Sequence, residues 1–152
     1  MTGPSLWPME IALDRHIPAE TVALRCAEVF GVDPGRVMVV PDAAAFFMVD
    51  QYNDHHDVLC AYSAATGAMV SLLSLHPKPA LEGFDPVRWA QRFCAAVPCR
   101  CLLPPEGCGP WDPARWRLVD ESGRIRRVAI APQADERHFV LATYGEELAP
   151  PI

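Results

Sequence analysis

Two stretches of this chain share one pattern, in which an amphipathic helical segment is followed by four short runs of strand-forming residues. The apolar residues of both helical segments recur at i, i+4, i+7 and i+8: Val22, Cys26, Val29 and Phe30 in the first, and Trp89, Phe93, Ala96 and Val97 in the second. This spacing places them on one face of a helix. Because a repeat fixes the architecture more firmly than local propensity does, it constrains the fold most.

The strand-like runs also correspond in order. The matched pairs are 36–41 with 99–104, 46–50 with 116–120, 58–61 with 128–131, and 68–72 with 138–142. Length differences fall between these runs, as expected of loops in a repeat. The alternative is that two α+β segments share their patterning by chance, and it predicts nearly the same secondary structure.

We therefore expect an α+β fold in a single domain over residues 1–152. Each copy is predicted to be a helix followed by a four-stranded antiparallel meander, with the helices packed on the sheet or sheets. The first copy spans about 17–76 and the second about 85–144, and residues from about 145 to 152 are expected to form a frayed tail. The sequence does not decide whether the meanders form one sheet or two.

Several residues mark where elements begin and end. Pro18 suits the first turn of one helix and Gly31 its C-terminal cap, while Asp85 and Pro86 suit the start of the other. Hairpin turns are predicted at 53–54, 65–67 and 122–123. The segment 10–13 is either a short strand or the lead into the first helix.

Composition restricts the classes of partner. The formal net charge of −6 argues against nucleic acid or an anionic membrane as the main partner and favours a basic protein. The first residues lack the basic and apolar regions of a signal peptide, and no apolar run has the length of a membrane span. We therefore expect a cytoplasmic protein with reduced thiols.

The turn Asn53-Asp54-His55-His56-Asp57 is the first candidate site. Adjacent histidines with flanking acids can bind a divalent metal or move protons. Successive strand residues point to opposite faces, however, so the two histidines chelate one ion only if the loop bends. A polar turn that contacts a partner is the favoured interpretation.

The cysteines form a second candidate. Cys94, Cys99, Cys101 and Cys108 lack the paired C-x2-C spacing of a usual zinc site. If 99–101 is a strand, the thiols of Cys99 and Cys101 face the same side, which suits either a metal clip or a buried face. We favour core thiols and predict no metal and no cofactor.

The third candidate is the loop 106–113, where the second copy departs from the first. Its glycines and prolines give it a defined shape, and Trp111 is a large anchor beside Asp112. Trp111 either contacts a partner or packs under the loop. Together with Asp54, His55, His56 and Asp57, these two residues make up the predicted partner-binding surface.

Function is inferred mainly from surface and charge. The chain has no G-x-S-x-G elbow, no P-loop and no G-x-G-x-x-G motif. The leading hypothesis is a non-enzymatic bacterial protein that binds another protein, either an immunity protein that neutralises a toxin or a chaperone for an effector. The alternative is a small enzyme or a ligand- or metal-binding domain that uses histidines and acids in a cleft between the repeats. A homodimer scaffold is a third hypothesis, since strand edges can pair across a twofold axis.

Overall fold

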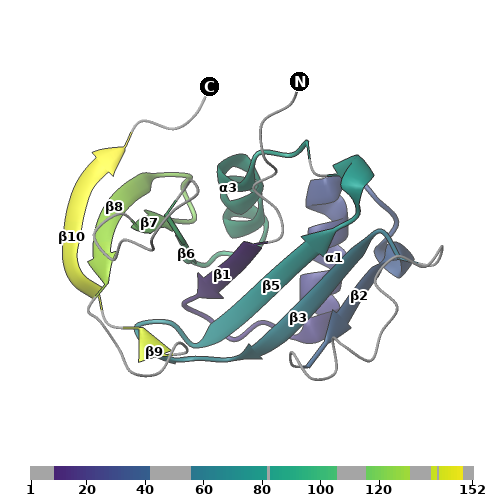
Figure 1. Cartoon of the computed structure of the whole chain (residues 1–152), viewed down its shortest axis with the longest axis horizontal. Coiled ribbons are helices and arrows are strands. Elements are labelled where there is room, and N and C mark those ends of the chain that lie inside the picture. The colour runs from purple at the N-terminus through teal and green to yellow at the C-terminus, as the bar shows by residue number, and fades with distance from the viewer. Residues whose placement is uncertain are drawn as a thin grey trace.

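The computed structural model describes residues 9–41, 56–81, 83–105, 116–130, 138–139 and 141–148. These residues contain an eight-stranded sheet, a small two-stranded sheet and two α-helices, so the fold has mixed α and β content, as predicted. Both helices lie on the same side of the curved large sheet (Figure 1). Neither helix is long and apolar enough to cross a lipid bilayer.

The two helices begin and end where the sequence predicts. α1 spans Ala19–Phe30, and its C-terminal cap Gly31 has the left-handed φ of 74° that glycine adopts without steric cost. α3 spans Pro86–Ala96, and the Asp85 side chain accepts a hydrogen bond from the backbone N–H of Arg88 at its start. Short 3-10 helices cover Pro34–Arg36 and Pro79–Leu81.

The large sheet has the strand order β10-β8-β7-β6-β1-β5-β3-β2. The strands are β1 (Met9–Leu13), β2 (Val37–Val40), β3 (Val58–Ala64), β5 (Ser71–Pro77), β6 (Cys101–Leu103), β7 (Trp116–Val119), β8 (Ile125–Ile130) and β10 (Leu141–Leu148). β1 pairs antiparallel with β5 on one side and with β6 on the other. Segment 10–13 is therefore a strand, and it joins the strands of both halves into one sheet.

The pairing in the first half differs from the expected meander. β2 pairs directly with β3, and the two strands run parallel. β3 then pairs antiparallel with β5 around the predicted 65–67 turn. A direct parallel pair leaves no place for another strand between β2 and β3, so this half is not an uninterrupted antiparallel meander. The strand expected at 46–50 lies outside the described residues.

In the second half, β6, β7, β8 and β10 pair antiparallel in chain order. The β7–β8 turn contains Gly123 with a φ of 86°, as its place in the predicted 122–123 turn requires. β10 continues to Leu148 because Glu147 and Leu148 pair with Arg126 and Ile125. Residues 145–148 therefore belong to a strand and not to the expected frayed tail, and 149–152 lie outside the described residues.

A small parallel sheet joins the two halves at a second place. β4 (Thr66–Gly67) pairs with β9 (His138–Phe139). This brings the β3–β5 connection of the first half beside the C-terminal region of the second half, as Figure 1 shows.

Alternation along the strands divides the apolar side chains between the two faces of the sheet. The main core lies between the sheet and both helices, and it includes Ile11, Leu73, Phe93 and Leu103. A second cluster on the opposite face includes Leu72, Leu102, Trp116 and Leu118. The two halves therefore share one core, which supports a single folding unit within the described chain.

Candidate functional site

Three chain segments meet at one end of the large sheet. Asp14 and Arg15 follow β1, Arg100 precedes β6, and Asp120 follows β7. They converge because Leu13 pairs with Cys101, and Cys101 in turn pairs with Val119. Pairing of the apolar strand residues thus carries the charged residues next to them into one site.

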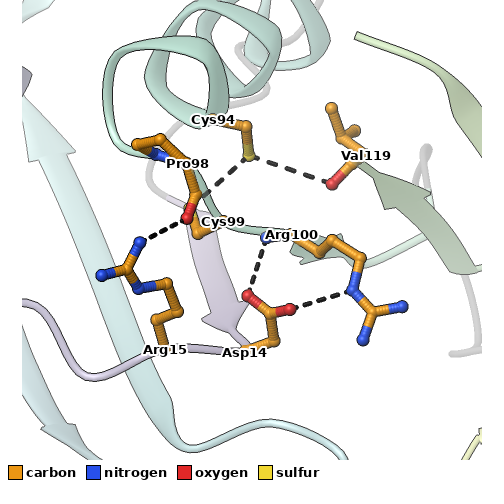
Figure 2. A network of polar contacts seen from close by, with 7 residues as sticks. All are labelled: Asp14, Arg15, Cys94, Pro98, Cys99, Arg100 and Val119. Atoms are coloured by element: carbon orange, nitrogen blue, oxygen red, sulfur yellow. Dashed lines mark hydrogen bonds and ion pairs between the residues drawn. The ribbon is translucent and has the colours of Figure 1, made fainter. Parts of the chain in front are cut away.

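Asp14 fixes the centre of this site. Its Oδ1 accepts a hydrogen bond from the backbone N–H of Arg100 at 2.7 Å, and its Oδ2 accepts one from Arg100 Nε at 2.9 Å. Arg15 Nη1 donates to the backbone carbonyl of Pro98 at 2.7 Å. Figure 2 shows Arg100 held by Asp14, and Arg15 held by Pro98 in the turn that follows α3. Charged groups held this way need little further ordering when they meet a partner.

Asp120 organises the turn on the other side of the site. Its Oδ1 accepts hydrogen bonds from the backbone N–H groups of Ser122 and Arg124 and from the Ser122 hydroxyl. Burial alone would raise the pKa of Asp120, but these hydrogen bonds and the nearby Arg124 charge outweigh it and lower the pKa. The carboxylate is therefore a permanent negative charge near neutral pH.

These residues line a groove of about 360 Å³. Its lining consists of Asp14, Arg15, Pro98, Cys99, Arg100, Asp120, Glu121 and Ser122. Three carboxylates and two guanidinium groups give the groove a net charge of −1. The side chains of Arg15, Arg100, Glu121 and Ser122 are exposed, so a partner can reach both signs of charge.

Three thiols lie beneath the groove. The sulfur atoms of Cys94 and Cys99 are 3.9 Å apart, and Cys94 Sγ also donates to the carbonyl of Val119 at 3.9 Å (Figure 2). Cys101 is on the same face of the sheet, as the strand pattern predicts. All three side chains are buried.

The surroundings of Cys94 and Cys99 keep these two thiols protonated. The contact with Cys101 and burial raise the pKa of Cys94, and the contact with Cys94 and burial raise that of Cys99. The thiolate is the form that attacks electrophiles and binds metals. No group of three or more metal-ligating side chains is placed to hold an ion in the part of the chain that the structure describes. Because they are buried, Cys94, Cys99 and Cys101 have the features of core residues.

The predicted His55–His56 turn is only partly described. Asp54 and His55 lie outside the described residues, as do Trp111, Asp112 and Cys108, so their predicted contacts stay predictions. His56 and Asp57 are half-buried just before β3.

Asp57 has a clear structural role. Its carboxylate accepts hydrogen bonds from Arg36 Nη2 at 2.9 Å and Arg36 Nε at 3.2 Å, and it forms an ion pair with Lys78 at 2.5 Å. Arg36, then Lys78, lowers the pKa of Asp57 to about 2. Backbone hydrogen bonds from Asp57 to Arg36 and from Lys78 to Asp57 tie the same three residues together. Asp57 thus joins β2, β3 and β5, while its predicted partner contact stays a prediction.

A serine–histidine pair, Ser74 and His76, lies away from the groove. Ser74 Oγ is 3.0 Å from His76 Nε2, and the two side chains share one face of β5 because they are two residues apart. Burial lowers the pKa of His76, which makes its ring neutral at neutral pH. This pair has the contact expected of a hydroxyl and a general base.

Sequence analysis does not single out Asp14, Arg15, Pro98 or Arg100. The only signal is that charged residues directly flank two apolar runs, at 11–13 and 101–103. That signal becomes informative only when the pairing of β1 with β6 is known.

No protein-family model, curated protein or solved structure matches this chain.

Proposed function

We propose that this chain is a non-enzymatic binding protein that docks on another protein through the groove at the end of β1. The observation that carries the proposal is the convergence of Asp14, Arg100 and Asp120, each fixed by backbone hydrogen bonds, in an open groove. Fixed charges of both signs favour one orientation of a partner and disfavour others.

The expected partner is a basic protein. The chain has a net charge of −6, and the groove itself is negative by one charge. Long-range attraction between opposite net charges accelerates association and weakens as salt screens it. Asp54 and Trp111 lie outside the described residues, so their predicted contacts stay predictions, with Asp54 offering negative charge and Trp111 an apolar anchor to the partner.

Two roles agree with such a surface in a bacterial cytoplasm. An immunity protein covers a toxin, and an effector chaperone covers an exported protein before its release. Both require only a complementary surface, so the identity of the captured protein separates them. Under the homodimer hypothesis, the captured protein is a second copy of this chain.

The test is a pull-down from the native host at low and moderate salt with matched charge variants. Glu121→Lys places a positive charge in the groove, and Glu10→Lys makes the same change on the exposed surface of β1. We expect Glu121→Lys to reduce capture of a basic protein at least about tenfold, while Glu10→Lys changes it little. Equal capture by both variants, or capture of no protein by the unaltered chain, would contradict the proposal.

We also propose that the fold arose by duplication of a helix-and-strands unit. In each half, a helix is followed by a strand of the shared sheet. Each half also ends on two neighbouring antiparallel strands of that sheet, which are β3 and β5 in the first half and β8 and β10 in the second. α1 and α3 contact each other over the same face. Superposition of residues 17–76 on 85–144 in an experimental structure tests this; unrelated paths of the helices and final strands would contradict it.

The Ser74–His76 pair favours a second candidate function, a small hydrolase that uses histidine as a base. Covalent labelling by a fluorophosphonate probe distinguishes the two functions. The hydrolase requires labelling that is lost in Ser74→Ala and strongly reduced in His76→Gln. Unlabelled native protein would leave protein binding as the supported function.

A further inference from the structure

A second cavity opens beside the first turns of α3. It has a volume of about 420 Å³, which is within the range of small-molecule sites. Its lining consists of Ala80, Gly83, Phe84, Asp85, Arg88, Trp89 and Arg92. The last four recur at i, i+3, i+4 and i+7, so one face of α3 and its cap forms one wall. The segment before the helix forms the other wall.

Phe84 and Trp89 line the floor of this cavity, and Phe30 and Phe93 pack behind them. Trp89 stacks on Phe93 with ring centroids 5.0 Å apart, and Phe30 lies 5.7 Å from Trp89. Phe84 packs edge-on against Phe30 at 5.4 Å. Trp89 is 1% exposed, and Phe84 is half-buried. Because α1 and α3 both contribute rings, the main core holds Phe84 in place, with part of its ring accessible from the cavity.

Two exposed arginines one helical turn apart stand beside this floor. Arg88 and Arg92 both line the cavity. In the described part of the chain, Arg92 makes no hydrogen bond or ion pair. A guanidinium group offers paired N–H donors that match a carboxylate.

Asp85 limits the charge of the ligand. Its carboxylate also lines the cavity, although it is engaged with the N–H of Arg88 at 3.1 Å. With two guanidinium groups and one carboxylate, the described residues that line the cavity carry a net charge of +1. A singly charged carboxylate matches this balance better than a doubly charged phosphate does.

We propose that this cavity binds a small aromatic carboxylate. The ring lies against the half-buried Phe84 ring, and the carboxylate accepts hydrogen bonds from Arg92 and the neighbouring Arg88. This site is separate from the protein-docking groove at the end of β1, and its existence does not depend on that groove.

The test is a titration of the 15N-labelled full chain, followed by amide shifts in NMR. The probes are phenylacetate and indole-3-acetate, and phenylacetamide is the neutral control. We expect both carboxylates to shift the amides of 83–92, and phenylacetamide to bind at least about tenfold more weakly. Arg92→Gln should weaken carboxylate binding by a similar factor, whereas Arg127→Gln, an equal charge change on the exposed surface of β8, should not.

Three results would overturn the proposal. These are absence of shifts with both carboxylates at millimolar concentration, equal binding of phenylacetamide, or equal weakening by Arg92→Gln and Arg127→Gln. The amide spectrum of each variant reports its folding directly, so a lost site is distinguishable from a lost fold. Capture of a protein by the groove is measured separately with Glu121→Lys.

Discussion

Asp14 holds Arg100 with both of its carboxylate oxygens, one on the backbone N–H at 2.7 Å and the other on Nε at 2.9 Å. The backbone N–H of Asp14 in turn donates to the carbonyl of Arg100 at 3.1 Å. The two residues lie 86 positions apart in the chain, so this contact joins its two halves at the mouth of the groove.

Replacement of Asp14 should separate the contribution of charge from that of the hydrogen bonds. Asp14→Ala removes both acceptors and should cost about 1–2 kcal/mol of unfolding free energy. Asp14→Asn retains one acceptor for the Arg100 N–H and should cost about half as much, because an exposed ion pair adds little. Urea denaturation measures both. An Asn variant as unstable as the Ala variant would show that charge dominates.

The ion pairs of Asp57 should make stability depend on pH in acid. Its pKa is lowered from 3.8 to about 2, so the stabilisation is complete above pH 3.8 and is lost as pH falls through about 2. Asp57→Asn should cost about 1 kcal/mol near neutral pH, with allowance for solvent screening, and should flatten the stability profile between these values. Glu10→Gln is the matched control on another strand. An unchanged profile in Asp57→Asn would refute this assignment.

The buried thiols should resist modification in the native protein. Five cysteines are free and buried in the described residues, and Cys108 lies outside them. In a Cys108→Ser variant, Ellman's reagent should therefore react rapidly only after unfolding in urea. If mass spectrometry locates fast labelling of the native protein at Cys94 or Cys99, the core around these two residues opens readily, and the prediction is wrong.

Phe93 should be among the most costly residues to truncate. It is fully buried, and its ring stacks on Trp89 between the sheet and α3. Phe93→Ala should cost about 3–5 kcal/mol, because it leaves a cavity in the main core. Phe93→Leu retains most of the apolar volume and should cost less, so it gives a measurable value if the Ala variant does not fold. Equal unfolding free energies for Phe93→Leu and the unaltered protein would contradict a close-packed site.

Local signals predicted the elements well. The apolar spacing of Val22 and Phe93 predicted the helices, and Gly31 and Asp85 predicted their ends correctly. Gly123 predicted the β7–β8 turn. These succeed because caps, turns and helix faces are decided by residues close together in the chain.

Long-range pairing was not predictable in the same way. Nothing near Val37 indicates that β2 pairs in parallel with β3, and nothing near Ile11 indicates that β1 lies between the two halves. Asp14 and Arg100 come together in the groove only because β1 pairs with β6. Side-chain alternation reports which face a strand buries, but it does not name the neighbouring strand.

The position of β1 has a consequence for how the chain reaches its native state. Its five residues are synthesised well before their neighbours, which come from residues 71–77 and 101–103. Until those strands are synthesised, the hydrogen-bonding groups of β1 have no sheet to join. Closing contacts over such long separations slows folding. The pairing of β1 is therefore complete only after β6 has been synthesised, and a fragment that stops before β6 would leave one edge of β1 open to pairing with other chains.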